Sequence, residues 1–499
     1  MAAEHPSTHT VRPPIIAVLG HVDHGKSTLL DFIRKSNTVA KEAGGITQHV
    51  AAYEVERERE GKTKRITFID TPGHAAFQAI RARGASVADI AILVVAADDG
   101  VKPQTLEALQ SIRAAETPFI VAINKIDKQN ASVERTQASL AENGVYLEKL
   151  GGDIPWVAIS AKAGTGVDEL LDLILLVAEV EELKGDAEKP ASGYVIEAHR
   201  DQKRGLAATL ILTDGTLESG MCVLAGRALA PVRIMEDYKG KNLRGASFST
   251  PVTLVGFDEL PEAGAEFRSY PSKKEAEAAR PAPIAAHASE TNASSSETFL
   301  LPVIIRADAA GSLEAIAHEL SQVGDEHARV QVVQTGLGSV TEGDVKAAVA
   351  GAIPAVVVGF GVGIDHTAEI LAHQHGVKIY TYDIIYKLTE GLDEALRTTR
   401  PTRTVEEVVG RIRILKLFSS RKDEYVVGGS LSEGYVAKKS NARVSRRKEI
   451  LGTGKVTNLQ ANKQNVDRID APAEFGAQIE APFEIAQGDI LEIITEKTE

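Results

Sequence analysis

A glycine-rich run near the start of the chain has the residue types and spacing of a phosphate-binding loop. The residues that fit G-x-x-x-x-G-K-[ST] are Gly20, His21, Val22, Asp23, His24, Gly25, Lys26 and Ser27. Glycines let the backbone wrap around phosphates, so that amide N–H groups point at the negative charge. Lys26 is expected to reach the β- and γ-phosphates, and the Ser27 hydroxyl to bind Mg²⁺. The alternative is a turn that matches by chance, which the β-branched run 15–19 just before the loop disfavours.

A second motif could contact the phosphates from a neighbouring strand. Asp70 and Gly73 belong to the run Asp-Thr-Pro-Gly that follows the apolar residues 66–69. Asp70 can hold Mg²⁺ through water, and the Gly73 amide can sense the γ-phosphate. The expected phosphate set is therefore the loop 20–27 together with Asp70 and Gly73.

Two later motifs predict guanine as the base. The expected guanine set is Asn124, Lys125, Asp127, Ser160, Ala161 and Lys162, and each motif closes a β-branched run, 119–123 or 156–159. The Asp127 carboxylate can accept hydrogen bonds from N1–H and N2–H₂ of guanine, a donor pair that adenine lacks. A backbone N–H beside Ser160 can donate to guanine O6. The alternative is that Asn124 and Asp127 only cap a turn.

Strands alternating with longer amphipathic stretches must position these motifs. Residues 15–183 predict a parallel sheet with crossover helices, and residues 301–396 predict a second, smaller α/β sandwich. Short strand-like runs with turn signals in 192–267 and 406–494 predict two β-barrels. The expected fold class is multidomain α/β plus β: a P-loop domain, a β-barrel, an α/β sandwich and a second β-barrel.

Composition shifts set the expected boundaries. We expect a flexible arm at 1–14, a first α/β domain at 15–185, a first barrel at 190–270, a linker at 271–297, a second α/β domain at 298–396, a linker at 397–405 and a C-terminal barrel at 406–499. The stretch 271–297 is rich in Ala, Ser, Lys, Glu and Pro, which favours a mobile connection.

Overall composition excludes several classes of protein. The 499 residues are 43% hydrophobic and 25% charged, which excludes global disorder. Cys222 is the only cysteine, so there is no disulfide framework, and a reducing cytosol fits. No apolar run approaches the roughly 18 residues of a membrane span, and no secretory signal is seen, so we expect a cytoplasmic location. The net charge of -13 argues against a general nucleic-acid coat, although residues 403–499 hold 16 Lys+Arg against 15 Asp+Glu.

Together these motifs resemble the G domain of GTPases. The runs Gly-His-Val-Asp-His-Gly-Lys at 20–26 and Asp-Thr-Pro-Gly-His at 70–74 narrow the resemblance to translational GTPases. The run Gly-Gly-Ile-Thr-Gln-His at 44–49 looks like the first switch of the bacterial translation initiation factor 2 family. Residues 306–315 and 336–345 are similar to that family's third domain, and the match extends over nearly all of 15–499.

The resemblance implies roles for further residues. Thr47 would bind Mg²⁺ when the first switch closes, and Asp23 would help to hold a monovalent cation, K⁺ or Na⁺. His74 would position the attacking water, with Lys26 neutralising charge. Val22 and Ile46 would form an apolar gate that keeps His74 from the water until the ribosome rearranges it. A solvated loop residue is the alternative for Thr47 and His74, and a turn-forming carboxylate is the alternative for Asp23.

The resemblance also implies function and partners. The chain would be an initiation factor and a ribosome-stimulated GTPase that hydrolyses GTP to GDP and phosphate with Mg²⁺. It would promote binding of initiator formylmethionyl-tRNA to the small ribosomal subunit and then joining of the large subunit, contacting ribosomal RNA. We expect no membrane partner, and a monomer off the ribosome.

The C-terminal barrel departs from the family where initiator tRNA is implied to bind. The family commonly has cysteines where Gly429 and Phe475 stand, and a Lys-Arg-Tyr-Lys run where this chain reads Gln-Ala-Asn-Lys at 460–463. The candidate tRNA-binding residues are Lys463, Glu474, Arg446, Arg447 and Lys448. A solvated basic hairpin is the equal alternative for the last three. Many family members carry a long extension before the G domain, and here we expect its contacts to be missing or replaced.

Two rival functions differ in class. An elongation-type carrier of aminoacyl-tRNA would have two barrels after its G domain, and the α/β pattern in 301–396 argues against it. A scaffold that tethers ribosomes with little turnover is disfavoured by the presence of Lys26, Thr47 and His74.

Overall fold

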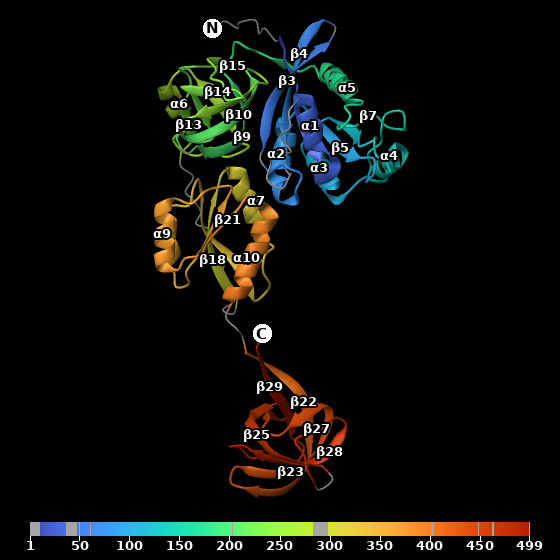
Figure 1. The fold of residues 1–499 in the computed structure, drawn as a ribbon, viewed down its shortest axis with the longest axis vertical. Helices are drawn as coiled ribbons and strands as arrows, with labels where there is room; N and C mark the ends of the chain where they lie inside the picture. Colours follow the sequence, from blue (N-terminus) through green and yellow to red (C-terminus); the bar gives the residue numbers. More distant parts are fainter. Residues whose placement is uncertain are drawn as a thin grey trace. The chain divides into compact units, whose positions relative to one another are not determined.

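The computed structural model describes residues 10–35, 47–48, 50–59, 61–201, 203–282, 298–400, 404–447, 449–461 and 464–498. The chain divides into two compact units, Met1–Thr399 and Arg400–Glu499. The first unit contains two α/β domains and a barrel, and the second is a barrel (Figure 1). The predicted fold class is confirmed. No helix among these residues is both long and apolar enough to cross a membrane.

The first α/β domain is built on a six-stranded sheet. In spatial order the strands are β3 (Ala51–Arg59), β4 (Lys62–Asp70), β2 (Ile15–Gly20), β5 (Ile90–Ala96), β6 (Phe119–Asn124) and β7 (Trp156–Ala158). The central strands β2 and β5 are buried at every residue, because helices cover both faces of the sheet. All neighbours are parallel except β3 and β4. The antiparallel strand β3 was not predicted, because its second half is charged and lacks an apolar pattern.

Helices follow the strands and place the motifs at the strand ends. They are α1 (Lys26–Arg34), α2 (Gln78–Val87), α3 (Pro103–Ala114), α4 (Val133–Glu142) and α5 (Val167–Val180), with 3₁₀ turns η1 (Val22–His24) and η4 (Ala75–Phe77). The helices α1 and α5 pack on one face of the sheet, and α2, α3 and α4 on the other. The carboxyl ends of β2, β4 and β6 consequently lie on one edge, as in nucleotide-binding α/β folds.

The described part of the expected N-terminal arm is attached to this domain. β1 (Thr10–Val11) pairs with β8 (Lys184–Gly185). Arg12 donates to the Asp89 carboxylate at 2.6 Å, and Asp89 also accepts from the Ile15 amide at 2.8 Å. The expectation of a flexible arm therefore does not hold for residues 10–14, and residues 1–9 lie outside the described residues.

The first barrel consists of antiparallel strands around one apolar core. They are β9 (Ser192–Asp201), β10 (Gly205–Asp214), β11 (Thr216–Glu218), β12 (Cys222–Ala225), β13 (Ala228–Pro231), β14 (Ile234–Glu236), β15 (Gly245–Ser247), β16 (Pro251–Val255) and β17 (Glu266–Tyr270). The core strands are rich in small and β-branched residues, which pack well on a pleated surface.

The expected linker at 271–297 begins with a helix instead. The Ser272 hydroxyl accepts a hydrogen bond from the Glu275 amide and so caps α6 (Lys273–Ala279). Ala276 has no exposed surface and packs against Cys222 and Leu229 of the barrel. One buried alanine is a weak sequence signal, which is why this helix was missed; residues 283–297 lie outside the described residues.

The second α/β domain has a four-stranded parallel sheet between two pairs of helices. In spatial order its strands are β19 (Ala328–Leu337), β18 (Phe299–Ala307), β20 (Val356–Phe360) and β21 (Ile379–Tyr382). Its helices are α7 (Ala310–Leu320), α8 (Glu342–Val349), α9 (His366–His375) and α10 (Ile385–Thr399). The last helix extends into the expected linker 397–405.

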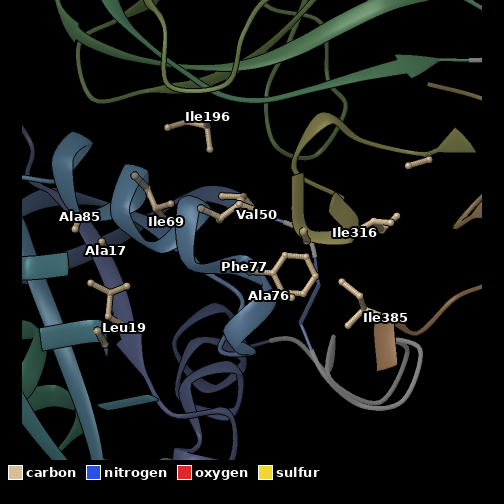
Figure 2. Packing of buried hydrophobic residues seen from close by; sticks show 14 of the residues in the cluster. Ala17, Leu19, Val50, Ile69, Ala76, Phe77, Ala85, Ile196, Ile316 and Ile385 are labelled. Carbon is tan, nitrogen blue, oxygen red and sulfur yellow. The ribbon is translucent and has the colours of Figure 1, made fainter. Parts of the chain in front are cut away.

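The two α/β domains share one apolar cluster. Phe77 is fully buried and lies with Ile316 of α7 and Ile385 of α10, and Val50 beside β3 belongs to the same cluster (Figure 2). Burying an aromatic side chain of this size contributes about 1.5–3 kcal/mol. The second α/β domain is therefore packed against the segment that carries His74.

The C-terminal barrel is closed by pairing between its first two strands. The strands are β22 (Thr404–Arg421), β23 (Glu424–Ala437), β24 (Asn441–Arg446), β25 (Glu449–Ala461), β26 (Gln464–Asn465), β27 (Arg468–Asp470), β28 (Ala473–Glu480) and β29 (Ile490–Thr498). Antiparallel pairing runs in the order β22, β29, β24, β25, β28 and β23, and β23 then pairs with β22.

The cover that α6 provides over Cys222 can be tested with one substitution. Burial raises the pKa of the Cys222 thiol, and the residue is only 1% exposed. Ala276→Asp would place a carboxylate in this apolar contact, detach α6 and speed labelling of Cys222 by a disulfide reagent about tenfold or more. The exposed neighbour Ala278→Asp is the matched control. Equal labelling rates for the two variants would show that α6 does not cover the thiol.

Candidate functional site

Two glycines shape the loop between β2 and α1. Gly20 has φ +143°, and a Cβ there would lie 2.5 Å from the Val94 carbonyl oxygen. Gly25 has φ +85°, and a Cβ there would lie 2.5 Å from Nδ2 of Asn124. Both positions therefore need glycine for conformation and for space. The loop leads directly into the first turn of α1, where backbone N–H groups are available for an anion.

Lys26 lies inside this loop and is 3% exposed. Its Nζ donates to the carbonyl oxygens of Gly20 and His21, both at 2.9 Å. Burial lowers the pKa of Lys26 to about 8, against the opposing charge of Asp70. The exposed Asp23 adds a smaller opposing charge. Among the described residues this buried ammonium donates to carbonyl oxygens, partners that it can exchange for phosphate oxygens.

His24 has a structural position that the sequence motif did not reveal. Its ring has no exposed surface, and Nδ1 lies 3.2 Å from the Val94 carbonyl oxygen. Burial lowers the pKa of His24 to about 4, so the ring is neutral at physiological pH. The ring of His21 meets it edge-on at 4.9 Å. The two histidine rings therefore pack against each other within the loop.

The two hydroxyls expected at Mg²⁺ lie together. Ser27 Oγ and Thr47 Oγ1 are 2.7 Å apart, and Thr47 is 8% exposed. Asp70, also 8% exposed, ends β4 close enough to influence Lys26. Two hydroxyls and a carboxylate are hard oxygen ligands, the kind that Mg²⁺ prefers. The residues present therefore fit Mg²⁺; Ile46, beside Thr47, lies outside the described residues.

Residues 70–74, called the second switch below, lie directly against the phosphate-binding loop. A Cβ on Gly73 would stand 2.4 Å from Nζ of Lys26 and 2.9 Å from Cα of Val22, so only glycine fits. The next residue, His74, is partly buried, and its Nδ1 accepts a hydrogen bond from the Ala76 amide at 3.2 Å. His74 thus caps η4, and its ring meets Phe77 edge-on at 6.4 Å. In this arrangement the His74 ring is hydrogen-bonded to the backbone two residues later.

Asn124 connects the base and phosphate elements. It is 1% exposed, and its Nδ2 donates to the His24 carbonyl oxygen at 2.8 Å. Its Oδ1 accepts from the amides of Lys125 and Ala161 at 2.7 and 2.9 Å. Three loops therefore meet on one buried amide, which is a stronger arrangement than a capped turn requires.

Asp127 and Ser160 form the rim of the expected guanine site. Asp127 is exposed, and its Oδ1 accepts from the Ser160 hydroxyl at 2.7 Å, a bond that lowers the pKa of Asp127. Ser160 also accepts from the Ala163 amide at 3.1 Å, while Lys162 is exposed. The carboxylate is therefore ionised and held in place at the mouth of the site.

Three residues near the site were missed, because a local sequence pattern does not show which group a side chain will contact. Arg81 has no exposed surface and donates to the His74 carbonyl oxygen at 2.5 Å. Gln48 donates from Nε2 to the Asp383 carbonyl oxygen at 2.8 Å and accepts from the Ile385 amide at 3.2 Å. Phe32 lies against Gly164, beside the guanine loop.

Of the candidate tRNA-binding residues that the structure describes, Arg446 and Arg447 lie apart from Glu474. Arg446 donates to both carboxylate oxygens of Asp489 at 2.8 and 3.0 Å, and Asp489 is 1% exposed. This ion pair gives Arg446 a structural partner, while 41% of its side chain remains exposed. Arg447 is exposed in the turn before β25, whereas Glu474 is exposed near the far end of that strand. Lys448 and Lys463 lie outside the described residues.

The two positions where the family commonly has cysteines face each other. Gly429 of β23 pairs in register with Phe475 of β28. Both are buried, and Phe475 Cζ would lie 3.9 Å from a Cβ at Gly429. A Cβ there would also come within 2.7 Å of Ile412. The phenylalanine ring therefore occupies the interior beside the glycine.

Comparison with known proteins agrees with this domain order. Residues 12–179 match the family described as elongation factor Tu GTP binding domain, residues 190–270 match elongation factor G domain 2, and residues 275–393 match translation-initiation factor 2. The crystal structure of GDP-bound aIF5B from Aeropyrum pernix covers 97% of this chain and 92% of its own, at 27% identity and a TM-score of 0.45.

Curated relatives extend the similarity over nearly the whole chain. Translation initiation factor IF-2 of Prochlorococcus marinus (strain NATL1A) is 43% identical over 96% of this chain, which spans only 42% of that relative's length. Translation initiation factor IF-2 of Rubrobacter xylanophilus is 41% identical over 98% of this chain and 72% of its own length. On this similarity, the chain belongs to the translation initiation factor IF-2 family.

Proposed function

We propose that the chain is a translation initiation GTPase that hydrolyses GTP to GDP and phosphate on the ribosome. Asn124 is the observation that carries this proposal, because its buried amide joins the phosphate loop at His24 to the guanine loop at Ala161. The base of a nucleotide bound there would contact the guanine loop, and its phosphates would contact the phosphate loop. Asn124 would hold these two loops at a fixed distance. Membership of the translation initiation factor IF-2 family indicates that this hydrolysis takes place during translation initiation.

Selection of GTP would rest on Asp127. Its exposed, ionised carboxylate can accept two hydrogen bonds from guanine, whereas adenine would leave it facing an unsuitable edge. Ser160 holds the carboxylate, and the Ala161 loop supplies a backbone donor for O6. Lys125 and Lys162 would flank the base.

Charge neutralisation at the phosphates would come from Lys26 and from the ligands of a metal ion. Ser27, Thr47 and Asp70 would hold Mg²⁺, which supplies positive charge where negative charge develops in phosphoryl transfer. The backbone amides of the loop 20–27 would bind the β-phosphate, except that of Val22, which is bonded to Gln104, and the Gly73 amide would bind the γ-phosphate. Asp23 would contribute to a monovalent cation site beside the loop.

Turnover would depend on His74. In the structure its Nδ1 is occupied by the Ala76 amide, so turning toward an attacking water costs this hydrogen bond, about 1 kcal/mol. Val22 and Ile46 would form the apolar gate between the His74 ring and the attacking water. We infer that contact with the large ribosomal subunit and its RNA supplies the rearrangement, so that hydrolysis is slow without ribosomes.

The C-terminal barrel would bind initiator formylmethionyl-tRNA for delivery to the small subunit before subunit joining. Glu474 and Arg447 remain exposed for such contacts, with Lys463 and Lys448 as further candidates. Arg446 would act indirectly by fixing the β24–β25 hairpin through Asp489. We place this activity in the cytoplasm, with the protein monomeric off the ribosome.

Ribosome dependence is the central test of the enzyme proposal. GTP turnover should rise about 10³-fold or more when ribosomes are added, as for other GTPases with activating partners. His74→Ala should lower the stimulated rate about 10²-fold with unchanged GDP affinity, because the residue acts on the water. The exposed His373→Ala is the matched control. A wild-type rate that ribosomes leave unchanged would favour the tethering scaffold instead.

The pH dependence of GDP affinity should report Lys26. Phosphate raises the pKa of a bound ammonium above its value of about 8 in the free protein, so binding takes up a proton. Affinity should be highest below pH 8 and fall above it, approaching about tenfold per pH unit. Lys26→Met, which binds weakly, corrects for titration of guanine itself. If the GDP affinities of wild type and Lys26→Met changed equally between pH 7 and 9, Lys26 would not be the titrating group.

Protection of aminoacyl-tRNA from deacylation tests the tRNA proposal. The full chain should slow deacylation of formylmethionyl initiator tRNA more than that of its unformylated form or an elongator aminoacyl-tRNA. Glu474→Ala should reduce the protection about tenfold, the effect of losing one charged contact, whereas Glu424→Ala at the far end of the paired strand should not. Equal protection of all three tRNAs would place initiator selection outside this chain.

A further inference from the structure

Two side chains of α3 contact the two segments that form the phosphate site. Gln104 Oε1 accepts a hydrogen bond from the Val22 amide at 3.1 Å. Glu107, three residues later, accepts at 2.8 Å from Nη2 of Arg81. Residues three apart lie on the same helix face, so one turn of α3 holds both partners.

Arg81 carries the contact from Glu107 to the second switch. The same guanidinium donates through Nη1 to the carbonyl oxygens of Pro72 and His74, at 3.4 and 2.5 Å. Burial lowers the pKa of Arg81, and Glu107 opposes this shift, so the carboxylate keeps the buried cation stable. A fully buried arginine with a charged partner does not readily change position.

The two segments held by α3 also touch each other. A Cβ on Gly73 would stand 2.9 Å from Cα of Val22, so the backbones are in contact there. Gln104 fixes the Val22 side of this contact, and Arg81 fixes the residues on both sides of Gly73. The spacing between the phosphate loop and the backbone of His74 is therefore set by α3.

We propose that Gln104, Glu107 and Arg81 form a brace, the α3 brace, that positions His74 for GTP hydrolysis without contributing to nucleotide binding. The inference rests on the proposed function as a ribosome-stimulated GTPase. The brace keeps the main chain of residues 72–74 fixed while the His74 ring turns, so the ring arrives at a defined place over the phosphates. The three residues are positioning residues, since the phosphate and base contacts belong to other side chains.

An effect on turnover alone follows from the geometry. Misplacing a reacting group by 1 Å can cost about 10²-fold in rate. The side chains proposed to bind the nucleotide, Lys26, Asn124 and Asp127, are hydrogen-bonded to groups other than Gln104, Glu107 and Arg81. Loss of the brace should therefore lower kcat and leave GDP affinity unchanged.

The test uses the full chain with ribosomes and four single variants. Gln104→Met and Glu107→Met remove the acceptor oxygens and should each lower the ribosome-stimulated kcat about tenfold or more. GTP KM, GDP Kd and the ribosome-independent rate should stay within about twofold. Gln104→Glu keeps an acceptor for the Val22 amide and should restore kcat. Gln110→Ala, exposed on the same helix, is the matched control.

A double variant separates a shared brace from two independent contacts. If Gln104 and Glu107 act together, Gln104→Met with Glu107→Met should lose no more kcat than the worse single variant. Losses that multiply would overturn the brace, as would a fall in kcat accompanied by an equal weakening of GDP binding. GDP binding also reports whether each variant is folded.

Wild type distinguishes failure of this inference from failure of the proposed function. If ribosomes do not stimulate wild-type hydrolysis, the proposed function fails and the brace has no reaction to serve. If wild type is stimulated and both Met variants keep its kcat, the brace alone is overturned.

Discussion

The hydrogen bonds of the Asn124 amide are the constraint on which the nucleotide site depends. The side chain is 1% exposed, so water cannot replace its partners, and each lost bond would leave a buried polar group unpaired. Its two ends fix His24 of the phosphate loop and Ala161 of the guanine loop at once. Gly25 is constrained by the same amide, because any Cβ would collide with Nδ2. Asn124 thereby sets the distance between the phosphate loop and the guanine loop.

The other side of the site is held by bonds that can be exchanged. Lys26 is bonded to backbone carbonyl oxygens, and His74 is bonded to an amide two residues away, each worth about 1 kcal/mol net. Gln48 extends this side to Asp383 and Ile385 of the second α/β domain. The expected base site is thus held by buried bonds, and the expected phosphate site by bonds that can be exchanged.

Local motifs were predictable and long-range partners were not. The loop 20–27 and the run 70–73 each follow an apolar run, so their positions at one sheet edge could be predicted from strand order alone. The structure brings Ser27 and Thr47 together as expected, although their roles stay predictions. The partners of Arg81, Gln48 and α6 were not predictable, because nothing in a local pattern shows which backbone groups will be buried opposite a side chain. The ion pair of Arg446 was missed for the same reason, since its partner Asp489 lies 43 residues away.

The exchange in the C-terminal barrel shows how two departures from a family pattern can be one physical change. Gly429 and Phe475 are paired in register with the ring beside the glycine, and Ile412 occupies the space where a side chain at Gly429 would begin. The two positions are therefore packed together in the barrel interior. Because strand residues alternate, Glu474 faces outward while Phe475 faces inward. The Gly429–Phe475 pair therefore lies in the barrel interior, whereas Glu474, which we propose as a contact to tRNA, lies on the outer face.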